Sequence, residues 1–330
     1  MIETVQVFGA RASGTNYFHD LAVRNLLDVD VTTTHLGEGY DNYGWKHGAI
    51  GGEVGVYVDE AQIVTDGTDY LRREDGRRIR RDDPRYVGVD RDGDPYIKNN
   101  ATPVDDDALL VVLYRNPIRW LQSLQRQPHH AHELYGVSFA DFLTRRWRTY
   151  MSAPGAEFSP DAAVRQHWVQ KGAVIEDEPS IFAHRAHSIA RFEKFRDQAP
   201  NVAYMNYEAL RRDPSACLGA LATHFGMALK TPFENTNSYK GHGSKPFIET
   251  NYAPIAKADL LRILHAVDWS AEAAANYSPA IDYAHIAKPE DIPDAQIDNP
   301  LQVLNFNPVI WCYRDGVLLA AERPNETALT

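Results

Sequence analysis

The stretch TVQVFGARASGTNYFHDLAVRNLL, residues 4–27, decides the fold. Residues 4–8 form a short run with the composition of a β-strand. After a turn that contains glycine and serine, apolar side chains recur at helical spacing, at Tyr17, Phe18, Leu21, Ala22, Leu26 and Leu27. The order strand, loop and helix predicts the first unit of an α/β sheet.

Later segments repeat this alternation. A second strand is predicted near residues 29–34, and a third, at 109–114, is almost wholly apolar, as expected when helices cover both faces of a parallel sheet. The next helix begins near Pro117, where a missing amide hydrogen costs little. A fourth strand at 201–207 precedes a helix at 215–225. We therefore predict an α/β fold with a central, mostly parallel sheet flanked by helices.

Two stretches interrupt the alternation. Residues 54–98 contain short strand-like runs separated by Asp-Gly turn signals, which predict a β-rich insertion. Residues 285–330 form a C-terminal extension that ends in a β-hairpin turning at Asp315-Gly316. Neither an internal repeat nor a low-complexity linker is present, which favours a single domain over residues 1–330.

The overall charge limits the classes of partner. Lysine and arginine number 34 against 45 aspartates and glutamates, a net charge of -11 in 330 residues, so no nucleic-acid or membrane partner is expected and any anion site must be built locally. Two cysteines cannot build a disulfide framework, and the N-terminal residues lack a basic and apolar leader pattern. We expect a cytoplasmic protein. Its oligomeric state has no signal in the sequence.

The loop GARASGTNY, residues 9–17, has the composition of an anion site. Its two glycines let the backbone approach a ligand, and the helix amides and the hydroxyls of Ser13 and Thr15 supply donors to a phosphate-like group. Simple helix capping is the alternative explanation of the same residues. A nucleotide triphosphatase would show Gly-Lys-Ser/Thr here, and Arg115 stands where that class needs an acid to hold magnesium. We therefore expect direct anion binding without a metal.

This loop resembles that of the sulfotransferases that use 3′-phosphoadenosine 5′-phosphosulfate (PAPS). Their Pro-Lys-Ser-Gly-Thr-Thr-Trp motif, Arg-Ser-Gly-Thr in bacterial relatives, cradles the 5′-phosphosulfate. The resemblance implies a P-loop NTPase-like sulfotransferase fold in which the nucleotide is bound by Arg11, Ala12, Ser13, Gly14, Thr15, Asn16 and Tyr17. Tyr17 matches an aromatic ring that lies against the adenine. The family's cation directly before the serine is here Ala12, with Arg11 one place earlier.

The family's second motif binds the 3′-phosphate through an arginine at a strand end and a serine on the next helix. Arg115 and Ser123 have the family's spacing of eight residues, and a guanidinium with a hydroxyl can hold one phosphate monoester. Tyr207 is similar to the family's tyrosine beside the adenine. Lys240 and Gly241 are similar to the basic, glycine-containing loop that closes over the 3′-phosphate.

Sulfuryl transfer needs a base for the acceptor hydroxyl, cations for the charge that develops, and in-line alignment. By resemblance, His47 is expected to be the base, with Lys46 and Arg11 as the catalytic cations. An imidazole is suited to this because it is largely neutral near pH 7. A structural hydrogen-bonding role for His47 is the alternative, and since some relatives use a glutamate, Glu38 and Glu53 are reserve candidates.

Three histidines, at positions 129, 130 and 132, are spaced closely enough to suggest zinc. Neighbouring histidines usually point apart, and no cysteine is near, so we expect them to line the acceptor mouth or a helix end and predict no metal site. Three further aromatic residues are assigned to the core, namely Phe142, Trp147 and Trp168.

The sequence thus predicts a PAPS-dependent sulfotransferase that transfers the sulfuryl group to a hydroxyl of a small molecule or carbohydrate by in-line displacement. A P-loop kinase or nucleotide hydrolase is one alternative, disfavoured by the missing Gly-Lys-Ser/Thr and by Arg115. A non-catalytic nucleotide-binding module, in which His47 performs no chemistry, is the other. The acceptor's identity would be set by segments such as residues 54–98, whose sequence does not reveal it.

Overall fold

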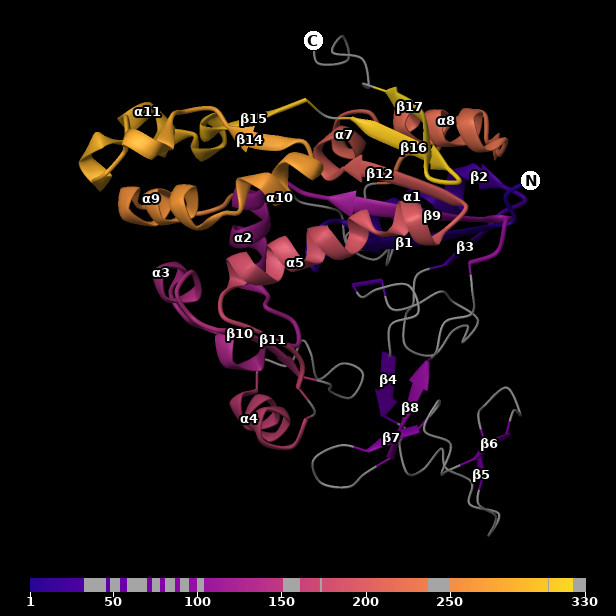
Figure 1. Cartoon of the computed structure of the whole chain (residues 1–330), viewed down its shortest axis with the longest axis horizontal. Coiled ribbons are helices and arrows are strands. Elements are labelled where there is room, and N and C mark those ends of the chain that lie inside the picture. The colour runs from indigo at the N-terminus through magenta and orange to yellow at the C-terminus, as the bar shows by residue number, and fades with distance from the viewer. Residues whose placement is uncertain are drawn as a thin grey trace.

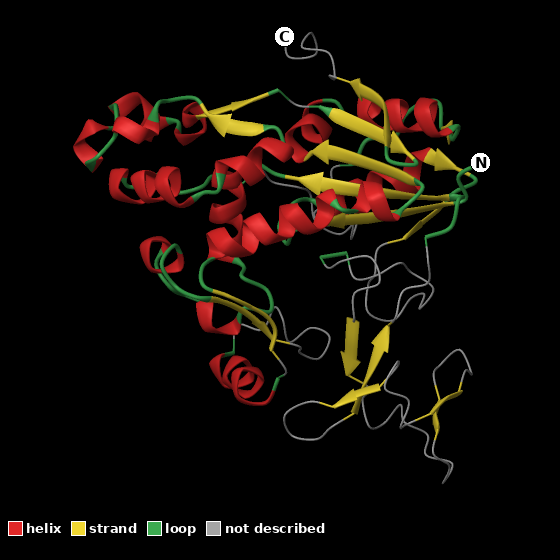
Figure 2. Cartoon of the chain, in the orientation of Figure 1, coloured by secondary structure: helices red, strands yellow, loops and turns green. Residues whose placement is uncertain are grey.

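The computed structural model of the chain describes residues 1–32, 46–47, 54–57, 70–72, 78–80, 87–89, 95–99, 104–150, 161–172, 174–236, 250–307 and 309–322. Figure 1 shows the arrangement of its helices and strands, and Figure 2 shows the same view coloured by secondary structure. Four residues singled out from the sequence lie outside the described residues: Glu38, Glu53, Lys240 and Gly241.

A six-stranded sheet, with strand order β17-β16-β12-β9-β1-β3, forms the centre of the molecule. Its parallel strands are β1 (Thr4–Gly9), β3 (Asp30–Thr32), β9 (Ala108–Tyr114) and β12 (Asn201–Asn206). The antiparallel strands that complete it are β16 (Ile310–Arg314) and β17 (Val317–Glu322). The predicted α/β class, the mostly parallel sheet and the C-terminal hairpin are therefore confirmed.

Every residue of β9 is buried because helices cover both faces of the sheet. Leu109, Val111 and Leu113 pack in a cluster with α1 (Thr15–Asn25) and α8 (Pro214–Phe225). The alternate side chains of β9 pack on the opposite face with α5 (Ile181–Glu193) and α6 (Phe195–Gln198). Burying one such Leu or Val side chain contributes about 1.5–3 kcal/mol, so this strand anchors the sheet.

Local sequence explains where the helices near the site begin. In α2 (Pro117–Arg126), the Asn116 side chain accepts a hydrogen bond from the Arg119 amide at 2.8 Å, and proline occupies the first turn. Asp213 caps α8 in the same way, accepting from the Ala216 amide at 2.9 Å. Helix α7 (Tyr207–Arg212) directly follows β12. By contrast, α1 begins after Gly14 with no side-chain cap.

A second layer lies beside the sheet. Its strands, β10 (Trp147–Tyr150) and β11 (Val174–Glu178), pair antiparallel. Its helices are α3 (Phe139–Phe142), α4 (Ala162–Lys171), α9 (Lys257–Ala266) and α10 (Trp269–Ala274). Phe142 and Trp147 are buried in its core, as predicted, whereas Trp168 is only half-buried on α4, a helix without buried residues.

The remaining strands are short. Within residues 54–99 they pair as β4 (Val54–Tyr57) with β8 (Pro95–Asn99), β7 (Val87–Val89) with β8, and β5 (Tyr70–Arg72) with β6 (Arg78–Arg80), all antiparallel. Two further antiparallel pairs are β2 (Leu26–Leu27) with β13 (Ala228–Leu229) and β14 (Tyr277–Pro279) with β15 (Leu304–Phe306).

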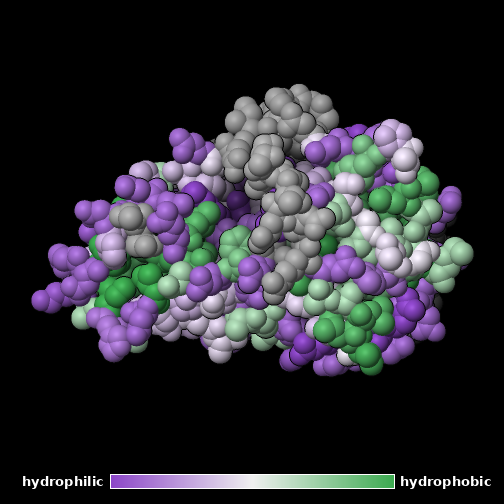
Figure 3. Space-filling view, turned by 90° about the horizontal axis from the view of Figure 1, so that it is seen from above, coloured by the Kyte–Doolittle hydropathy of each residue, from purple (hydrophilic) through white to green (hydrophobic). Residues whose placement is uncertain are grey.

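Short helical segments connect the C-terminal elements. They are η5 (Tyr283–His285), η6 (Pro289–Asp291), α11 (Asp294–Asp298) and η7 (Pro300–Val303), while η2 (His132–Leu134) follows α2. None of the helices in the described part of the chain is long and apolar enough to cross a membrane. On the face seen from above, hydrophilic and hydrophobic residues are interspersed (Figure 3).

Candidate functional site

The loop between β1 and α1 is closely packed around its two glycines. A Cβ atom on Gly9 would lie 2.4 Å from the Ser13 Oγ and 2.8 Å from the Leu113 carbonyl oxygen. A Cβ on Gly14, whose φ is +97°, would lie 2.3 Å from the Tyr207 ring. Neither position therefore accommodates a side chain without movement of its neighbours, and at Gly14 the backbone conformation itself disfavours one. The loop's path depends on both glycines.

Hydrogen-bond donors remain at this loop. The Ser13 Oγ is buried and has no hydrogen-bond partner among the described residues. The first main-chain bonds of α1 run from the Tyr17 and Phe18 amides to the Gly14 carbonyl, at 3.0 and 3.1 Å. The amides at the very start of this eleven-residue helix precede those bonds and have no side-chain cap. A buried hydroxyl and an uncapped helix start together fit an oxyanion such as a phosphate or a phosphosulfate.

Lys46 and His47 pack directly against this loop. The Gly9 amide donates to the Lys46 carbonyl at 2.8 Å, and the His47 Nδ1 lies 2.6 Å from the Gly9 carbonyl oxygen. The buried Lys46 ammonium donates to the Asn16 Oδ1 at 2.7 Å. These contacts place a cation and an imidazole at the start of α1, although both are far from the loop in sequence.

His47 is held as a neutral base. Burial lowers its pKa well below the usual value, and the charges of Lys46 and Arg11 lower it further, against the opposing effect of the hydrogen bond to Gly9. Because a carbonyl oxygen only accepts, Nδ1 carries the proton, and Nε2 of the neutral ring has the lone pair. The imidazole is therefore unprotonated near pH 7 and can accept a proton at Nε2.

Arg11 connects the loop to the second layer. Its side chain is only 1% exposed, and its Nη1 donates to the Glu176 Oε2 at 3.1 Å. The Trp120 indole donates to the Arg11 carbonyl oxygen at 2.7 Å. The charge of Arg11 is thus compensated by the Glu176 carboxylate of β11. Removing one of these two residues would leave the other charge buried.

Glu176 is ionised in spite of its burial. Burial alone would raise its pKa, but His184, Arg11 and Arg191 lower it to about 2. The carboxylate also accepts a hydrogen bond from the Thr149 hydroxyl at 2.9 Å. Glu176 was not predicted from the sequence, because the pairing of β11 with β10 is what brings its carboxylate close to the β1–α1 loop.

The three clustered histidines have different surroundings. Burial lowers the pKa of His130 well below its usual value, as do the nearby charges of Arg11 and His129, so these two histidines lie on the Arg11 side. His132 is buried instead between Tyr135 and Tyr150, with ring centroids 6.4 and 6.2 Å away. Burial and then Arg165 lower the pKa of His132 to about 4. In the described part of the chain, no group of three or more His, Cys, Asp or Glu is arranged to hold a metal ion.

Arg115 and Ser123 converge on one point. The Arg115 Nη2 donates to the Tyr252 hydroxyl at 3.1 Å, and Ser123 also hydrogen-bonds that hydroxyl. Burial would raise the pKa of Tyr252, but the charge of Arg115 and these hydrogen bonds lower it. The Arg115 Nη1 donates to the Ala12 carbonyl oxygen at 3.0 Å, so this arginine also contacts the β1–α1 loop. The two sequence motifs meet because β1 and β9 are parallel neighbours, with Gly9 opposite Leu113.

Two tyrosines lie between the motifs. The Tyr207 ring packs against Gly14, and the Arg115 guanidinium lies 4.9 Å from its centroid. Tyr17 contacts Tyr207 edge to face at 6.2 Å, and Arg211 lies 4.8 Å from the Tyr17 centroid. The structure thus brings Tyr17 and Tyr207 together, and a guanidinium lies over the face of each ring.

A polar network fixes the turn that carries Arg115. Glu208 accepts hydrogen bonds from the Asn116 amide at 3.0 Å and from the Tyr277 hydroxyl at 2.7 Å. Arg185, which is buried, donates to the Arg115 carbonyl oxygen at 2.7 Å. From the sequence, no role was assigned to Glu208, Arg185 or Tyr277. Their contacts hold the backbone of the turn that carries Arg115.

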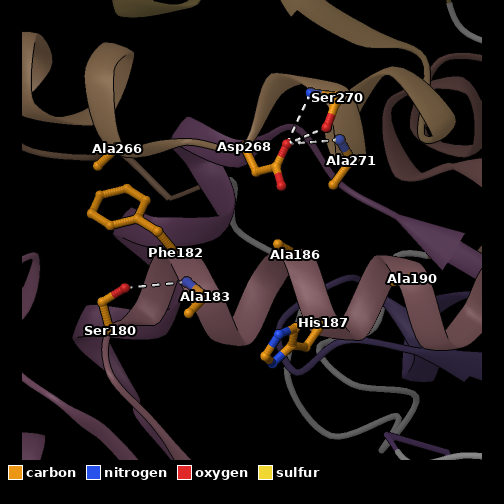
Figure 4. Close-up of a pocket in the computed structure, with 10 residues that line it drawn as sticks. All are labelled: Ser180, Phe182, Ala183, Ala186, His187, Ala190, Ala266, Asp268, Ser270 and Ala271. Atoms are coloured by element: carbon orange, nitrogen blue, oxygen red, sulfur yellow. Dashed lines mark hydrogen bonds between the residues drawn. The ribbon is translucent and has the colours of Figure 1, made fainter.

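A separate groove of about 620 Å³ lies between α5 and α10. Figure 4 shows Phe182, Ala186 and His187 on its α5 side, opposite Asp268, whose carboxylate is occupied by Ser270 and Ala271. None of its lining residues belongs to the two motifs. No lysine or arginine among the described residues lines this groove.

Comparison of the chain with family models, curated proteins and solved structures finds no match.

Proposed function

We propose that the protein is a PAPS-dependent sulfotransferase. The observation that carries this proposal is that two groups suited to bind anions lie close together at the carboxyl edge of β1 and β9: the loop of Ser13, and Arg115 with Ser123. PAPS carries one anion on each side of a single nucleoside, and the nearby Tyr17 and Tyr207 supply aromatic rings that an adenine could contact. This combination supports PAPS better than a nucleotide with phosphates on one side only.

Each group of the nucleotide is assigned to described residues. The 5′-phosphosulfate would be held by the amides of residues 14–16 and the hydroxyls of Ser13 and Thr15, where the buried Ser13 hydroxyl lacks a described partner. The 3′-phosphate would be held by the Arg115 guanidinium and the Ser123 hydroxyl. Tyr17 and Tyr207 would flank the adenine. Lys240 and Gly241 remain assigned to this nucleotide from the resemblance alone.

In the proposed reaction, the acceptor hydroxyl attacks the sulfur atom. A new oxygen–sulfur bond forms while the bond between sulfur and the 5′-phosphate oxygen breaks, and the hydroxyl proton passes to the His47 Nε2. The Lys46 ammonium, held by Asn16, would stabilise the charge on the leaving phosphate oxygen. Arg11 would act through its field and by fixing the loop, because Glu176 holds its guanidinium inside. The acceptor is proposed to be a hydroxyl of a small molecule or carbohydrate, in the cytoplasm.

Nucleotide binding tests this proposal without knowledge of the acceptor. Thermal unfolding would be measured with 3′-phosphoadenosine 5′-phosphate (PAP), with 5′-AMP, and with ATP and magnesium. A ligand present at about a hundred times its dissociation constant stabilises the folded state by about 2.7 kcal/mol. We expect PAP to give the largest shift, because only PAP engages both anion sites. A larger shift with ATP and magnesium would contradict the proposal and favour a P-loop kinase or hydrolase.

A further inference from the structure

A short strap, residues 250–253, runs along α2 beside Arg115. The Gln122 side-chain amide donates to the Ala253 carbonyl oxygen at 3.0 Å. The Arg126 Nη1 donates to the Thr250 hydroxyl at 2.9 Å. Between these two attachments, the Tyr252 hydroxyl reaches Arg115 and Ser123. The strap therefore holds a phenol at the point where both groups of the second motif converge.

The surroundings of Tyr252 are strongly cationic. Besides Arg115, the guanidinium groups of Arg119 and Arg126 lie 5.0 and 5.8 Å from the centroid of its ring. In the described part of the chain, Arg115 and Arg126 donate to neutral oxygens and form no ion pair. Several positive charges around one phenol, in a chain of net charge -11, indicate a site for a multiply charged anion.

The hydrogen bonds of Tyr252 indicate its role toward such an anion. A guanidinium only donates, so the phenolic oxygen is the acceptor in its bond with Arg115. A phosphate oxygen is a stronger acceptor and would take over the donors of Arg115 and Ser123. The phenol would then donate its own hydrogen to the phosphate, while Arg119 and Arg126 keep its ring in place.

We propose that Tyr252 is a further ligand of the 3′-phosphate, beside Arg115 and Ser123, and sets the preference for a nucleotide that carries a phosphate monoester at this position. This inference rests on the proposed function. It assigns to the strap a direct part in nucleotide selection, which neither of the two sequence motifs contains. No covalent step is involved, since only the hydrogen-bond partners of the phenol change.

Tyr252→Phe tests this inference, because it removes the hydroxyl and keeps the ring between the arginines. PAP and 5′-AMP differ only in the 3′-phosphate, so their dissociation constants would be measured by calorimetry for the wild type and the variant. Loss of a hydrogen bond to a charged group should weaken PAP binding roughly tenfold and leave 5′-AMP unchanged. As a matched control, Tyr283→Phe removes a hydroxyl from a ring that contacts His265 and Trp269 instead, and should change neither constant.

A preference for PAP over 5′-AMP that survives Tyr252→Phe within a factor of about two, or grows, overturns the inference and leaves the proposed function standing. A wild-type protein that does not prefer PAP overturns the proposed function and the inference with it. Arg126→Gln provides a second test that does not depend on how Tyr252→Phe folds, because Arg126 is exposed. It should weaken PAP about threefold without affecting 5′-AMP, and equal loss for both nucleotides would count against the inference.

Discussion

The two ends of the candidate nucleotide site are built in different ways. At the β1–α1 loop, the backbone provides the site: Gly9 and Gly14 leave room, Ser13 is buried, and Glu176 already compensates the nearest arginine. At α2, side chains provide it, because Arg115 and Arg126 donate to neutral oxygens beside Tyr252, with no carboxylate paired to either among the described residues.

This contrast teaches which changes each end should tolerate. A binding site made of backbone amides and close packing is disrupted when a substitution adds an atom to it. Its affinity for a ligand changes little with salt concentration. Unpaired guanidinium groups tolerate changes of shape but act through charge, which salt screens over about 8 Å at physiological ionic strength. The following predictions separate steric from electrostatic dependence at the two ends.

The largest expected effect is on turnover, and it comes from changing His47 at the β1–α1 loop. His47→Ala should lower kcat roughly 10²- to 10⁴-fold, as loss of a general base does, with PAP affinity unchanged. Turnover of PAPS with an accepted hydroxyl substrate would be measured, with His285→Ala as the control, since that side chain is 86% exposed. Unchanged turnover in His47→Ala would favour a non-catalytic binding module.

The pH profile sharpens this prediction. The pKa of His47 lies well below its usual value, so the base is already deprotonated at pH 6 and kcat/KM, which reports the free enzyme, should stay flat from pH 8 to 6. In the complex with PAPS, the bound anions would offset the charges of Lys46 and Arg11 that lower the pKa of His47. The apparent pKa of His47 in the pH profile of kcat should therefore be higher than in the profile of kcat/KM. A fall of kcat/KM centred near pH 6.5 would contradict the depressed pKa.

Much of the fold follows from local sequence. The apolar run of β9 and the strand, loop and helix at residues 4–25 were predictable because burial on both faces and turn residues leave a local pattern. The spacing of Arg115 and Ser123 was likewise readable, since both lie within one strand-to-helix connection. These features depend on neighbours in the chain, which the sequence displays directly.

The supporting residues could not be found in this way. Tyr252 contacts Arg115 from 137 positions away, Glu176 contacts Arg11 from 165, and Glu208 contacts Asn116 from 92. Each contact depends on how separate elements pack, and a lone tyrosine or glutamate in the sequence carries no signal of its partner. The β10–β11 pair, which delivers Glu176, was also missed because its strands are joined by a long segment containing α4.

The second prediction tests the steric dependence of the loop end. Gly14→Ala should weaken PAP binding by about 100-fold, because the new Cβ would lie 2.3 Å from the Tyr207 ring in a backbone with φ of +97°. Gly226→Ala is the matched control: φ is +69°, but no atom lies within 4 Å of the new Cβ. It should cost about 1 kcal/mol of stability, from backbone strain alone, and leave binding intact. Equal binding losses in both variants would contradict a specific role for the contact between Gly14 and Tyr207.

The third and smallest expected effect is a loss of PAP affinity when Arg115, at the α2 end, is changed. This loss should depend on charge. Arg115→Gln should weaken PAP binding about tenfold in low salt, and the difference from the wild type should shrink as salt rises, because the lost interaction is ionic and partly screened. Ser123→Ala removes a neutral donor, so its smaller loss should be the same at every salt concentration. Arg262→Gln removes the same charge from an exposed arginine paired with Asp259, and should leave PAP binding unchanged. If Arg262→Gln weakened PAP as much as Arg115→Gln did, net charge rather than the convergence of Arg115 and Ser123 would control the α2 end.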